Sequence, residues 1–182
     1  MRLLIETITL AGGCFWCTEA VFTIVTGVER IESGYTGGNI ANPTYEQVSS
    51  GTTGHAEAVQ ISFDTNIISL KEILEIFFAT HDPTSINRQG ADIGTQYRSA
   101  IFYHNLEQKQ VSEKIISDLN SQKIWDLPIV TSVEPLEVFY FAESYHKDYY
   151  KKHPKQAYCQ TVIKPKLIKL QQSYLNKLKI AE

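Results

Sequence analysis

The chain of 182 residues is 43% hydrophobic and 20% charged, values that exclude wholesale disorder and predict one domain, residues 1–182, with a core of its own. The net charge of −3 is unevenly placed: residues 1–146 hold 8 Lys and Arg against 18 Asp and Glu, whereas residues 147–182 hold 9 Lys against 2 acids. Because no nucleic-acid recognition motif accompanies the Lys-rich end, we expect a solvated extension from about residue 160 and no nucleic-acid partner.

The first part of the chain is predicted to contain two strands, a helix and a long loop. Leu3–Leu10 is rich in aliphatic residues and Thr and predicts a strand that ends at two glycines, after which residues 18–25 are helix-like. Glycines and an Asn-Pro pair punctuate residues 34–54 and predict a loop. His55–Phe63 alternates as a strand does, and the residues of one face are Glu57, Val59, Ile61 and Phe63.

The middle of the chain predicts two helices and one strand. A Ser69-x-x-Glu72 capping box opens a helix that His81-Asp82-Pro83 stops. Residues 85–96 are polar and predict a loop, residues 99–103 predict a strand, and residues 105–119 predict an amphipathic helix. The apolar residues at helical spacing in the two helices are Leu70, Ile73, Leu74, Phe77, Val111, Ile115 and Leu119.

The last part of the chain predicts a broken strand, an irregular segment and a final helix. Ile129–Phe141 predicts a strand broken by Pro135, and the Tyr-, His- and Lys-rich segment beyond Glu143 is predicted to be irregular until a helix after Pro165. One face of that helix carries Leu167, Leu170, Tyr174 and Leu178. Since strands and helices alternate loosely, with hairpin-like and crossover connections, the pattern predicts an α+β sandwich whose antiparallel or mixed sheet is covered by helices.

Cys14 is the first candidate for chemistry. The predicted strand leads through Gly12-Gly13 into a helix, which places this thiol at the helix N-terminus, where unpaired N–H groups and the helix dipole favour negative charge. Such a position lowers a thiol pKa from about 8.5 to roughly 3.5–7.5 and makes the thiol a nucleophile at neutral pH. The competing interpretation is a buried Cys that packs as a small hydrophobe.

The residues after Cys14 add an aromatic pair and a second thiol. Phe15 and Trp16 are consecutive and cannot both face the core, so one of them is expected to line a pocket beside the thiol, unless Trp16 packs on a neighbouring loop. Cys17 completes a Cys-x-x-Cys, which is a redox signal in cytosolic proteins. No second such pair and no His pair completes a zinc site, so we expect neither a metal nor another cofactor.

Glu57 is the most informative carboxylate, because it lies on the apolar face of its predicted strand. It lies either at the wet end of the strand or in a partly desolvated position. Desolvation would raise its pKa and let it hold a proton at neutral pH, as a general acid must. Asp92 and Tyr97 lie in a polar loop before a strand, where binding residues are often found.

No targeting or membrane-spanning segment is predicted. The apolar start Leu3–Ile5 is interrupted by Glu6, which makes it too short for a signal peptide, and no apolar run reaches the length of a membrane span. Three cysteines are an odd, low number that argues against a secreted disulfide framework. We therefore expect a cytoplasmic protein without a membrane partner, whose cysteines are reactive or incidental.

A series of motifs runs along residues 7–159. Gly13-Cys14-Phe15-Trp16 is followed by Glu19, and further motifs lie in segments 33–38, 43–48, 54–59, 81–84, 87–90, 92–99 and 139–146. In composition and order these motifs resemble the A-type peptide methionine sulfoxide reductases. The resemblance implies a two-layer α/β sandwich of the α+β class, with a ferredoxin-like core, a mixed sheet, long loops and an irregular C-terminal segment.

The resemblance implies a peptide-methionine (S)-S-oxide reductase, which returns methionine-(S)-sulfoxide, in oxidised proteins or as the free amino acid, to methionine. Cys14 would attack the sulfoxide sulfur and Glu57 would protonate the oxygen. The chemistry agrees, because sulfoxide oxygen is a poor leaving group until it is protonated. The residues implied to hold the S-methyl group and the polar cradle are Phe15, Trp16, Tyr45, Asp92 and Tyr97.

The same resemblance implies that Cys14 becomes a sulfenic acid, that a second thiol condenses with it to a disulfide, and that thioredoxin reduces this disulfide. Many relatives carry Gly at the position of Cys17, and Cys159 matches the distal recycling position of other members. We expect Cys159 to lie in a mobile, Lys-flanked segment that swings to Cys14, whereas Cys17 is always near but constrained by helix geometry. Cys159 is favoured, and a relay through both thiols is the further alternative.

Two other functions compete with the reductase. A thioredoxin-like thiol–disulfide carrier would use Cys14 and Cys17 but would leave Glu57 and Asp92 without a role. A binding module would use the aromatic pair as a recognition patch and the Lys-rich end for an acidic partner. The resemblance favours the reductase, acting as a monomer.

Overall fold

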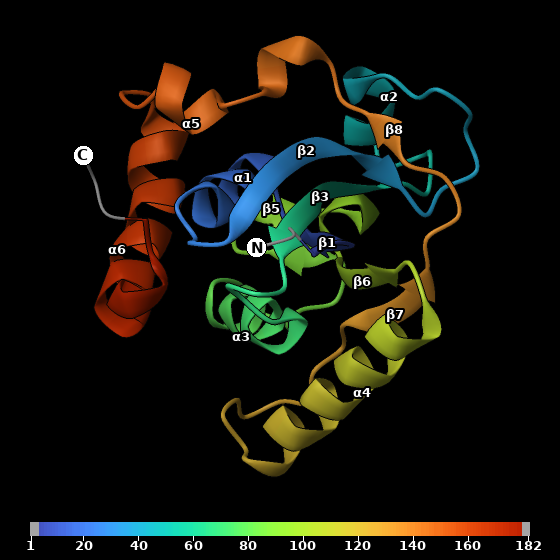
Figure 1. Ribbon diagram of the computed structural model, residues 1–182. Coiled ribbons are helices and arrows are strands. Elements are labelled where there is room, and N and C mark those ends of the chain that lie inside the picture. Colours follow the sequence, from blue (N-terminus) through green and yellow to red (C-terminus); the bar gives the residue numbers. More distant parts are fainter. Residues whose placement is uncertain (1–3, 180–182) are drawn as a thin grey trace.

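The computed structural model describes residues 4–179, so Leu3 of the first predicted strand lies outside the described residues. The main sheet consists of β1 (Ile5–Gly12), β2 (Val28–Thr36), β3 (Ala56–Asp64), β6 (Ser99–Tyr103), β7 (Ser132–Pro135) and β8 (Tyr140–Phe141). A separate two-stranded ribbon consists of β4 (Arg88–Gln89) and β5 (Asp92–Ile93). The helices are α1 (Phe15–Thr23), α2 (Tyr45–Ser49), α3 (Leu70–Ala79), α4 (Leu106–Ser121), α5 (Tyr149–Lys152) and α6 (Lys164–Tyr174) (Figure 1).

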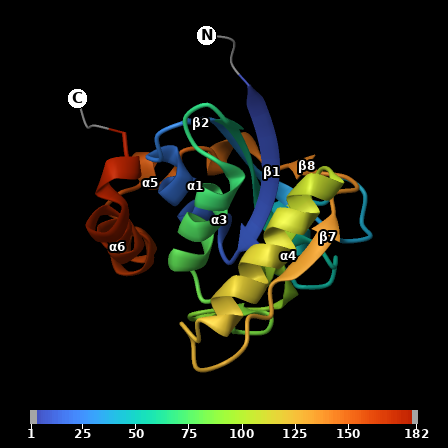
Figure 2. The same ribbon diagram turned by 60° about the horizontal axis from the view of Figure 1, so that its bottom comes forward.

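The main sheet confirms the predicted sandwich and its ferredoxin-like core. Its strand order is β7-β6-β1-β3-β2-β8, and the four inner strands pair antiparallel. α1 follows β1 and α3 follows β3, the alternation of a ferredoxin-like core. β7 pairs parallel with β6 after the crossover through α4, which makes the sheet mixed. Figure 2 shows α1, α3 and α4 together over one face of the sheet.

The two faces of the sheet differ in the size of their side chains. Alternate residues of β3 point to the helices, where Val59, Ile61 and Phe63 are fully buried in the main core. The intervening residues Ala56 and Ala58 belong to a second cluster that packs against the segment joining β7 to β8. Glu57, between these alanines, therefore shares the helix-covered face, as the alternation predicted.

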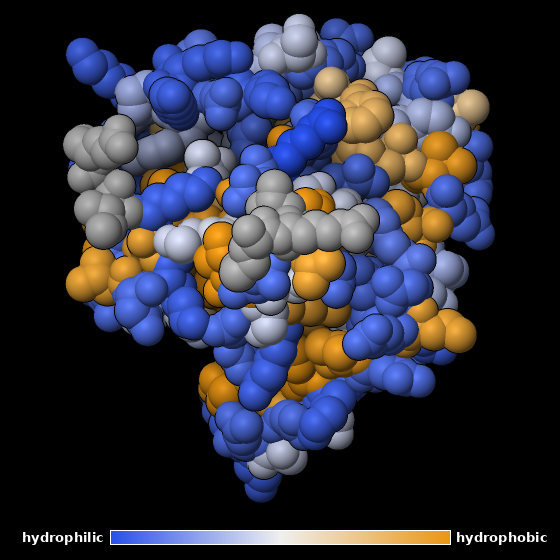
Figure 3. All heavy atoms as spheres, in the orientation of Figure 1, coloured by the Kyte–Doolittle hydropathy of each residue, from blue (hydrophilic) through white to orange (hydrophobic). Residues whose placement is uncertain are grey.

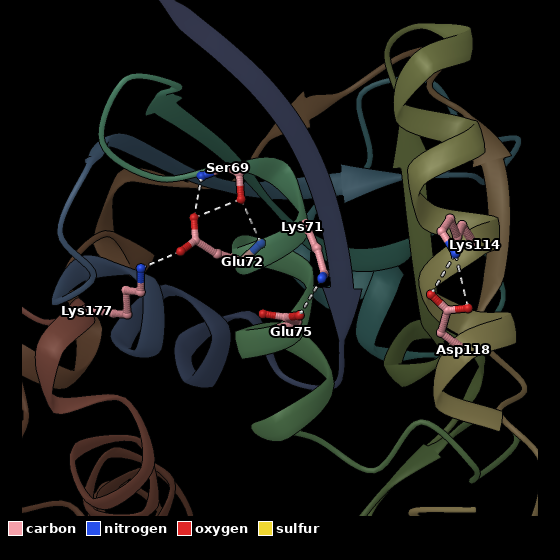
Figure 4. Close-up of polar contacts among 7 residues, drawn as sticks. All are labelled: Ser69, Lys71, Glu72, Glu75, Lys114, Asp118 and Lys177. Carbon is pink, nitrogen blue, oxygen red and sulfur yellow. Dashed lines mark hydrogen bonds and ion pairs between the residues drawn. The ribbon is translucent and has the colours of Figure 1, made fainter. Parts of the chain in front are cut away.

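The predicted capping box opens α3 and is linked to the far end of the chain. The Glu72 N–H donates to the Ser69 hydroxyl at 3.3 Å, and the Ser69 N–H donates to the Glu72 carboxylate at 2.8 Å. The same carboxylate pairs with Lys177, which anchors the C-terminal segment on α3 (Figure 4). The i,i+4 pairs of Lys71 and Lys114 in Figure 4 are exposed and contribute little.

The prediction of a continuous loop over residues 34–54 is wrong at the start and in the middle of that range, whereas residues 50–54 are irregular as predicted. Gly34–Thr36 continue β2, a strand hidden from sequence analysis because a register shift between Val28 and Arg30 breaks its alternation. Gly34 marks a close approach rather than a turn: a Cβ there would lie 2.4 Å from the Tyr140 carbonyl oxygen of β8. α2, capped by the Thr44 hydroxyl, lies further along the same range.

The predicted strand over residues 129–141 is two strands at opposite edges of the sheet. Pro135 ends β7 beside β6, and the chain then crosses the alanine-rich face to form β8 beside β2. The polar residues 85–96 are largely irregular as predicted, but they include the β4–β5 ribbon and a 3₁₀ turn at Thr95–Tyr97.

The C-terminal segment is more ordered than predicted. A helix begins at residue 157, passes through a π-helical turn at Cys159–Ile163 and continues as α6. The wide π turn accommodates Pro165, whose nitrogen has no proton to donate to the preceding turn. Leu170 is buried as predicted, but Leu178 lies beyond the helix, where it pairs with Val25.

The surface is mostly polar on the face shown in Figure 3, where apolar residues form patches between charged ones. Such a mixture is ordinary for a globular protein. Within residues 4–179 no helix combines the length and the apolar character that crossing a membrane requires.

Candidate active site

Cys14 lies where β1 passes into α1, as predicted. Gly13 has φ +93°, a conformation that L side chains rarely adopt, and a Cβ there would lie 2.6 Å from the Gln89 side chain. Cys14 is the N-cap of α1, which begins at Phe15, three residues before the predicted helix. The turn at Gly13 thus places the Cys14 thiol at the first turn of α1. The Cys14 side chain is 8% exposed.

The two thiols of the Cys-x-x-Cys affect each other's ionisation. Burial, followed by the hydrogen bond with Cys17, raises the pKa of the Cys14 thiol well above its ordinary value. That hydrogen bond lowers the pKa of Cys17 to about 7, helped by the positive charge of Lys166. The expectation of a depressed Cys14 pKa is therefore wrong for the resting protein, because desolvation outweighs the helix dipole. Cys17 is the thiol that ionises first.

Glu57 is the buried carboxyl group of the site. Its side chain is 1% exposed, and the Phe15 N–H donates to its carboxylate at 3.0 Å. Desolvation raises the pKa of Glu57 to about 8, and the charge of Asp92 acts in the same direction. The wet-end alternative is thus excluded, and Glu57 holds a proton at neutral pH beside the helix N-terminus that carries Cys14.

Two phenols and a second carboxylate complete the polar surroundings. Desolvation raises the pKa of Tyr45 to about 12 and also raises that of Tyr97, so both phenols remain hydrogen-bond donors. Negative charge on Glu57 or Cys14 raises the pKa of both phenols, so the four groups lie near one another. The negative charge of Asp92 raises the pKa of Tyr97 and of Glu57. The Asp92 carboxylate also accepts a 2.7 Å hydrogen bond from the Tyr158 hydroxyl.

Only Phe15 of the aromatic pair is fully buried, as expected for two consecutive large side chains. Phe15 is 1% exposed and lies with its ring centroid 5.7 Å from that of Tyr35. Trp16 remains half-buried and stacks on Tyr149 at 3.7 Å with an interplanar angle of 3°. Its indole N–H donates to His146 Nδ1 at 3.0 Å, so the proton of the His146 ring lies on Nε2.

Phe15 and Trp16 form an aromatic wall, and sequence analysis did not identify the residues that support it. Glu143 accepts hydrogen bonds of 2.7 Å from the Tyr35 hydroxyl and the Tyr45 N–H, and lies 3.5 Å from His146 Nε2. The segment 142–146 stands out as a motif, but its partners lie about a hundred residues away in the sequence. Only the tertiary structure brings them together.

The third cysteine lies in the same cluster as the other two. Cys159 is fully buried in the π-helical turn and packs in one apolar cluster with Cys14, Cys17, Ala20 and Ile163. All three thiols are free. The expectation that Cys159 lies in a mobile segment is therefore wrong: helix packing holds it beneath the Cys-x-x-Cys. The preceding residue, Tyr158, places its hydroxyl 3.6 Å from Cys17 Sγ.

A pocket of about 410 Å³ opens onto the thiols. Cys14, Cys17 and Asp92 form one part of its wall, and the helix that carries Tyr158 and Lys166 forms another. The aromatic pair and Tyr45 do not line it.

The family model described as "Peptide methionine sulfoxide reductase" matches residues 6–179. The chain belongs to this family. The "Peptide methionine sulfoxide reductase MsrA" of Deinococcus radiodurans is 55% identical to it over 174 residues, which are 96% of this chain and 84% of that protein.

Solved structures of other proteins share the fold. Mxr1 from Saccharomyces cerevisiae in its reduced form matches with a TM-score of 0.78 and 36% identity over 87% of this chain and 91% of that one. A structure of the same yeast protein in complex with Trx2 matches with a TM-score of 0.55 and 25% identity, over 82% of this chain and 89% of that one.

Proposed function

We propose that residues 1–182 form a single catalytic domain that reduces methionine-(S)-sulfoxide, free or in oxidised proteins, with thioredoxin as the reductant. The observation that carries this proposal is a carboxyl group, Glu57, held protonated beside a buried thiol at a helix N-terminus. A sulfoxide oxygen needs such a proton before it can leave.

In the proposed first step the Cys14 sulfur attacks the sulfoxide sulfur and Glu57 gives its proton to the sulfoxide oxygen. The S–O bond of the substrate breaks, and the oxygen is transferred to Cys14 as a sulfenic acid. The thiol proton of Cys14 replaces the proton that Glu57 has given up, so the step is balanced. The protonated phenols of Tyr45 and Tyr97 stabilise the charge that develops on oxygen.

We assign the substrate's S-methyl group to the aromatic wall of Phe15 and Trp16. Stacking on Tyr149 and the hydrogen bond to His146 hold the Trp16 indole in one orientation. Asp92 acts by its charge, which favours the protonated form of Glu57, and by its hydrogen bond with Tyr158.

We propose that Cys17, rather than Cys159, condenses first with the sulfenic acid. Cys17 lies three residues after Cys14, donates its backbone N–H to the Cys14 carbonyl oxygen at 3.1 Å and ionises first. Cys159 lies in the same cluster and then receives the disulfide by exchange with Cys17. Thioredoxin reduces the final disulfide, a role supported by the complex of the yeast relative with Trx2. We further propose a monomer that works in the cytoplasm, where such thiols are kept reduced.

The function is tested with the two epimers of an N-acetylated methionine sulfoxide ester and a chemical thiol reductant. We expect turnover of the S epimer only. In this epimer the S-methyl group can contact the aromatic wall while the sulfoxide oxygen lies next to Glu57, whereas the other epimer cannot meet both conditions at once. The measurement is methionine ester released by each epimer. Equal turnover of both epimers, or none of either, would contradict the proposed site.

The order of the recycling thiols is tested with thioredoxin and its reductase. A Cys17→Ser variant is expected to release about one methionine per chain and then to turn over at least roughly tenfold more slowly. A Cys159→Ser variant is expected to keep most of its turnover, since the Cys14–Cys17 disulfide still forms. The opposite ranking of the two variants would assign resolution to Cys159.

A further inference from the structure

Lys166 occupies an unusual position for a lysine of the Lys-rich C-terminal segment. Along the helix from residue 157 to residue 174, the residues that face the protein are Cys159, Ile163 and Leu170, all buried. Lys166 lies between them and is half-buried, whereas its neighbours Lys164 and Lys169 are exposed. It is therefore a charged residue on the inward face of an otherwise apolar contact.

The side chain of Lys166 adjoins Cys17 from two sides. It lines the 410 Å³ pocket together with Cys14 and Cys17. It also lines a small cavity behind α1, between Cys17 and His81. Within residues 4–179 the Lys166 ammonium has no acidic side chain within ion-pair distance, so its charge is not neutralised by a carboxylate.

The other groups near Cys17 carry no positive charge. The titratable side chains that face it from the surrounding elements are Cys14, Glu57, His81, Asp92, Tyr158 and Cys159. His81 is neutral, because desolvation lowers its pKa to about 4. Among these described groups, a thiolate at Cys17 therefore finds a cation only at Lys166.

We propose that Lys166 stabilises the thiolate of Cys17 and thereby speeds the attack of Cys17 on the sulfenic acid of Cys14. This inference rests on the proposed function, which supplies the sulfenic acid. In the step, the Cys17 sulfur forms a bond to the Cys14 sulfur and the S–O bond breaks. The oxygen leaves with its own hydrogen and one further proton as water. Lys166 acts through Cys17 and is a positioning residue, not a catalytic one.

The pKa of Cys17 agrees with this geometry, since the charge of Lys166 lowers it. Removal of the charge should raise the pH at which the thiolate forms, which is about 7 in the wild type. A Lys166→Arg variant keeps the charge and should keep most of the effect. A merely structural role for the side chain predicts no shift along the pH axis.

The experiment is a single turnover in a Cys159→Ser background, so that Cys14 and Cys17 are the only thiols. Methionine release and loss of free thiols are followed separately after mixing with the sulfoxide. For Lys166→Met we expect the loss of thiols to be roughly threefold to tenfold slower at pH 7, and the midpoint of its pH dependence to be raised. Methionine release, which reports the first step, should not be slowed. The matched control is Lys169→Met, an exposed lysine of the same helix, which should retain the rate of its parent.

An unchanged rate of thiol loss in Lys166→Met, or equal slowing in Lys169→Met, would overturn the inference. Failure of the proposed function is distinguishable, because no methionine would then be released by the parent itself. If Lys166→Met loses helix content, Lys166→Gln replaces it with the same expected slowing and the same contradiction. Recovery of the rate and of the pH midpoint in Lys166→Arg supports a charge effect, and slowing equal to that of Lys166→Met opposes it.

Discussion

Replacing Cys14 with Ser is expected to abolish methionine formation, with a loss of more than about 10⁴-fold in kcat/KM. A serine hydroxyl is a far weaker nucleophile than a thiol near neutral pH, and an oxygen at this position cannot accept the sulfoxide oxygen as a sulfenic acid. The substitution removes one sulfur from a buried site and adds a small polar group, so the fold is expected to persist. The measurement is methionine released in the presence of a chemical thiol reductant.

The control for this prediction is Cys17→Ser, which carries the same substitution three residues further along α1. It should still release one methionine per chain, because the first step needs only Cys14. Retained turnover in Cys14→Ser, with Cys17→Ser inactive, would show that the nucleophile is Cys17, the thiol with the lower pKa in the resting protein.

Replacing Glu57 with Gln is expected to slow the methionine-forming step by about 10²–10⁴-fold, the usual contribution of a general acid. The amide has nearly the same shape, can accept the Phe15 N–H and carries no charge. Because the buried carboxyl already holds its proton at neutral pH, the variant should fold as well as the wild type. The measurement is the rate of methionine release in a single turnover.

The rate of the methionine-forming step should depend on pH through the ionisation of Glu57. Glu57 acts in its protonated form, and its pKa in the folded protein is about 8, so its contribution is present below pH 8 and is lost as the pH rises through that value. The fall on the alkaline side should therefore disappear in Glu57→Gln. An unchanged rate in the variant, or the same alkaline fall, would place the acid on another residue.

The elements with an unbroken pattern could be predicted from the sequence, and those whose pattern is interrupted could not. α3 and α4 keep the helical spacing of apolar residues that burial of one face imposes, and β3 and β6 are continuous segments of mostly buried residues. β2 contains a bulge, and the π-helical turn before Pro165 makes a helix interior look like a helix start. Tertiary contacts stabilise both irregular segments, and the spacing of residues in the sequence does not reveal such contacts.

The site divides along similar lines. The turn at Gly13 and the position of Cys14 on a helix N-terminus are local properties, and the sequence predicts them. The pKa of Cys14 depends on how deeply the surrounding elements bury it, and the local dipole argument gave the wrong direction. The hydrogen bond from Trp16 to His146 joins residues 130 positions apart, so no rule based on sequence spacing could predict it.

The most direct test of the account is to locate the oxygen after one turnover. In a Cys17→Ser and Cys159→Ser double variant, no second thiol remains to remove a sulfenic acid from Cys14. After reaction with methionine-(S)-sulfoxide, we expect one methionine per chain and one added oxygen in the intact mass, mapped to the peptide that carries Cys14 and trapped there by a sulfenic-acid reagent. Methionine released without oxygen on Cys14, or oxygen on any other residue, would contradict the assignment of Cys14 as the nucleophile.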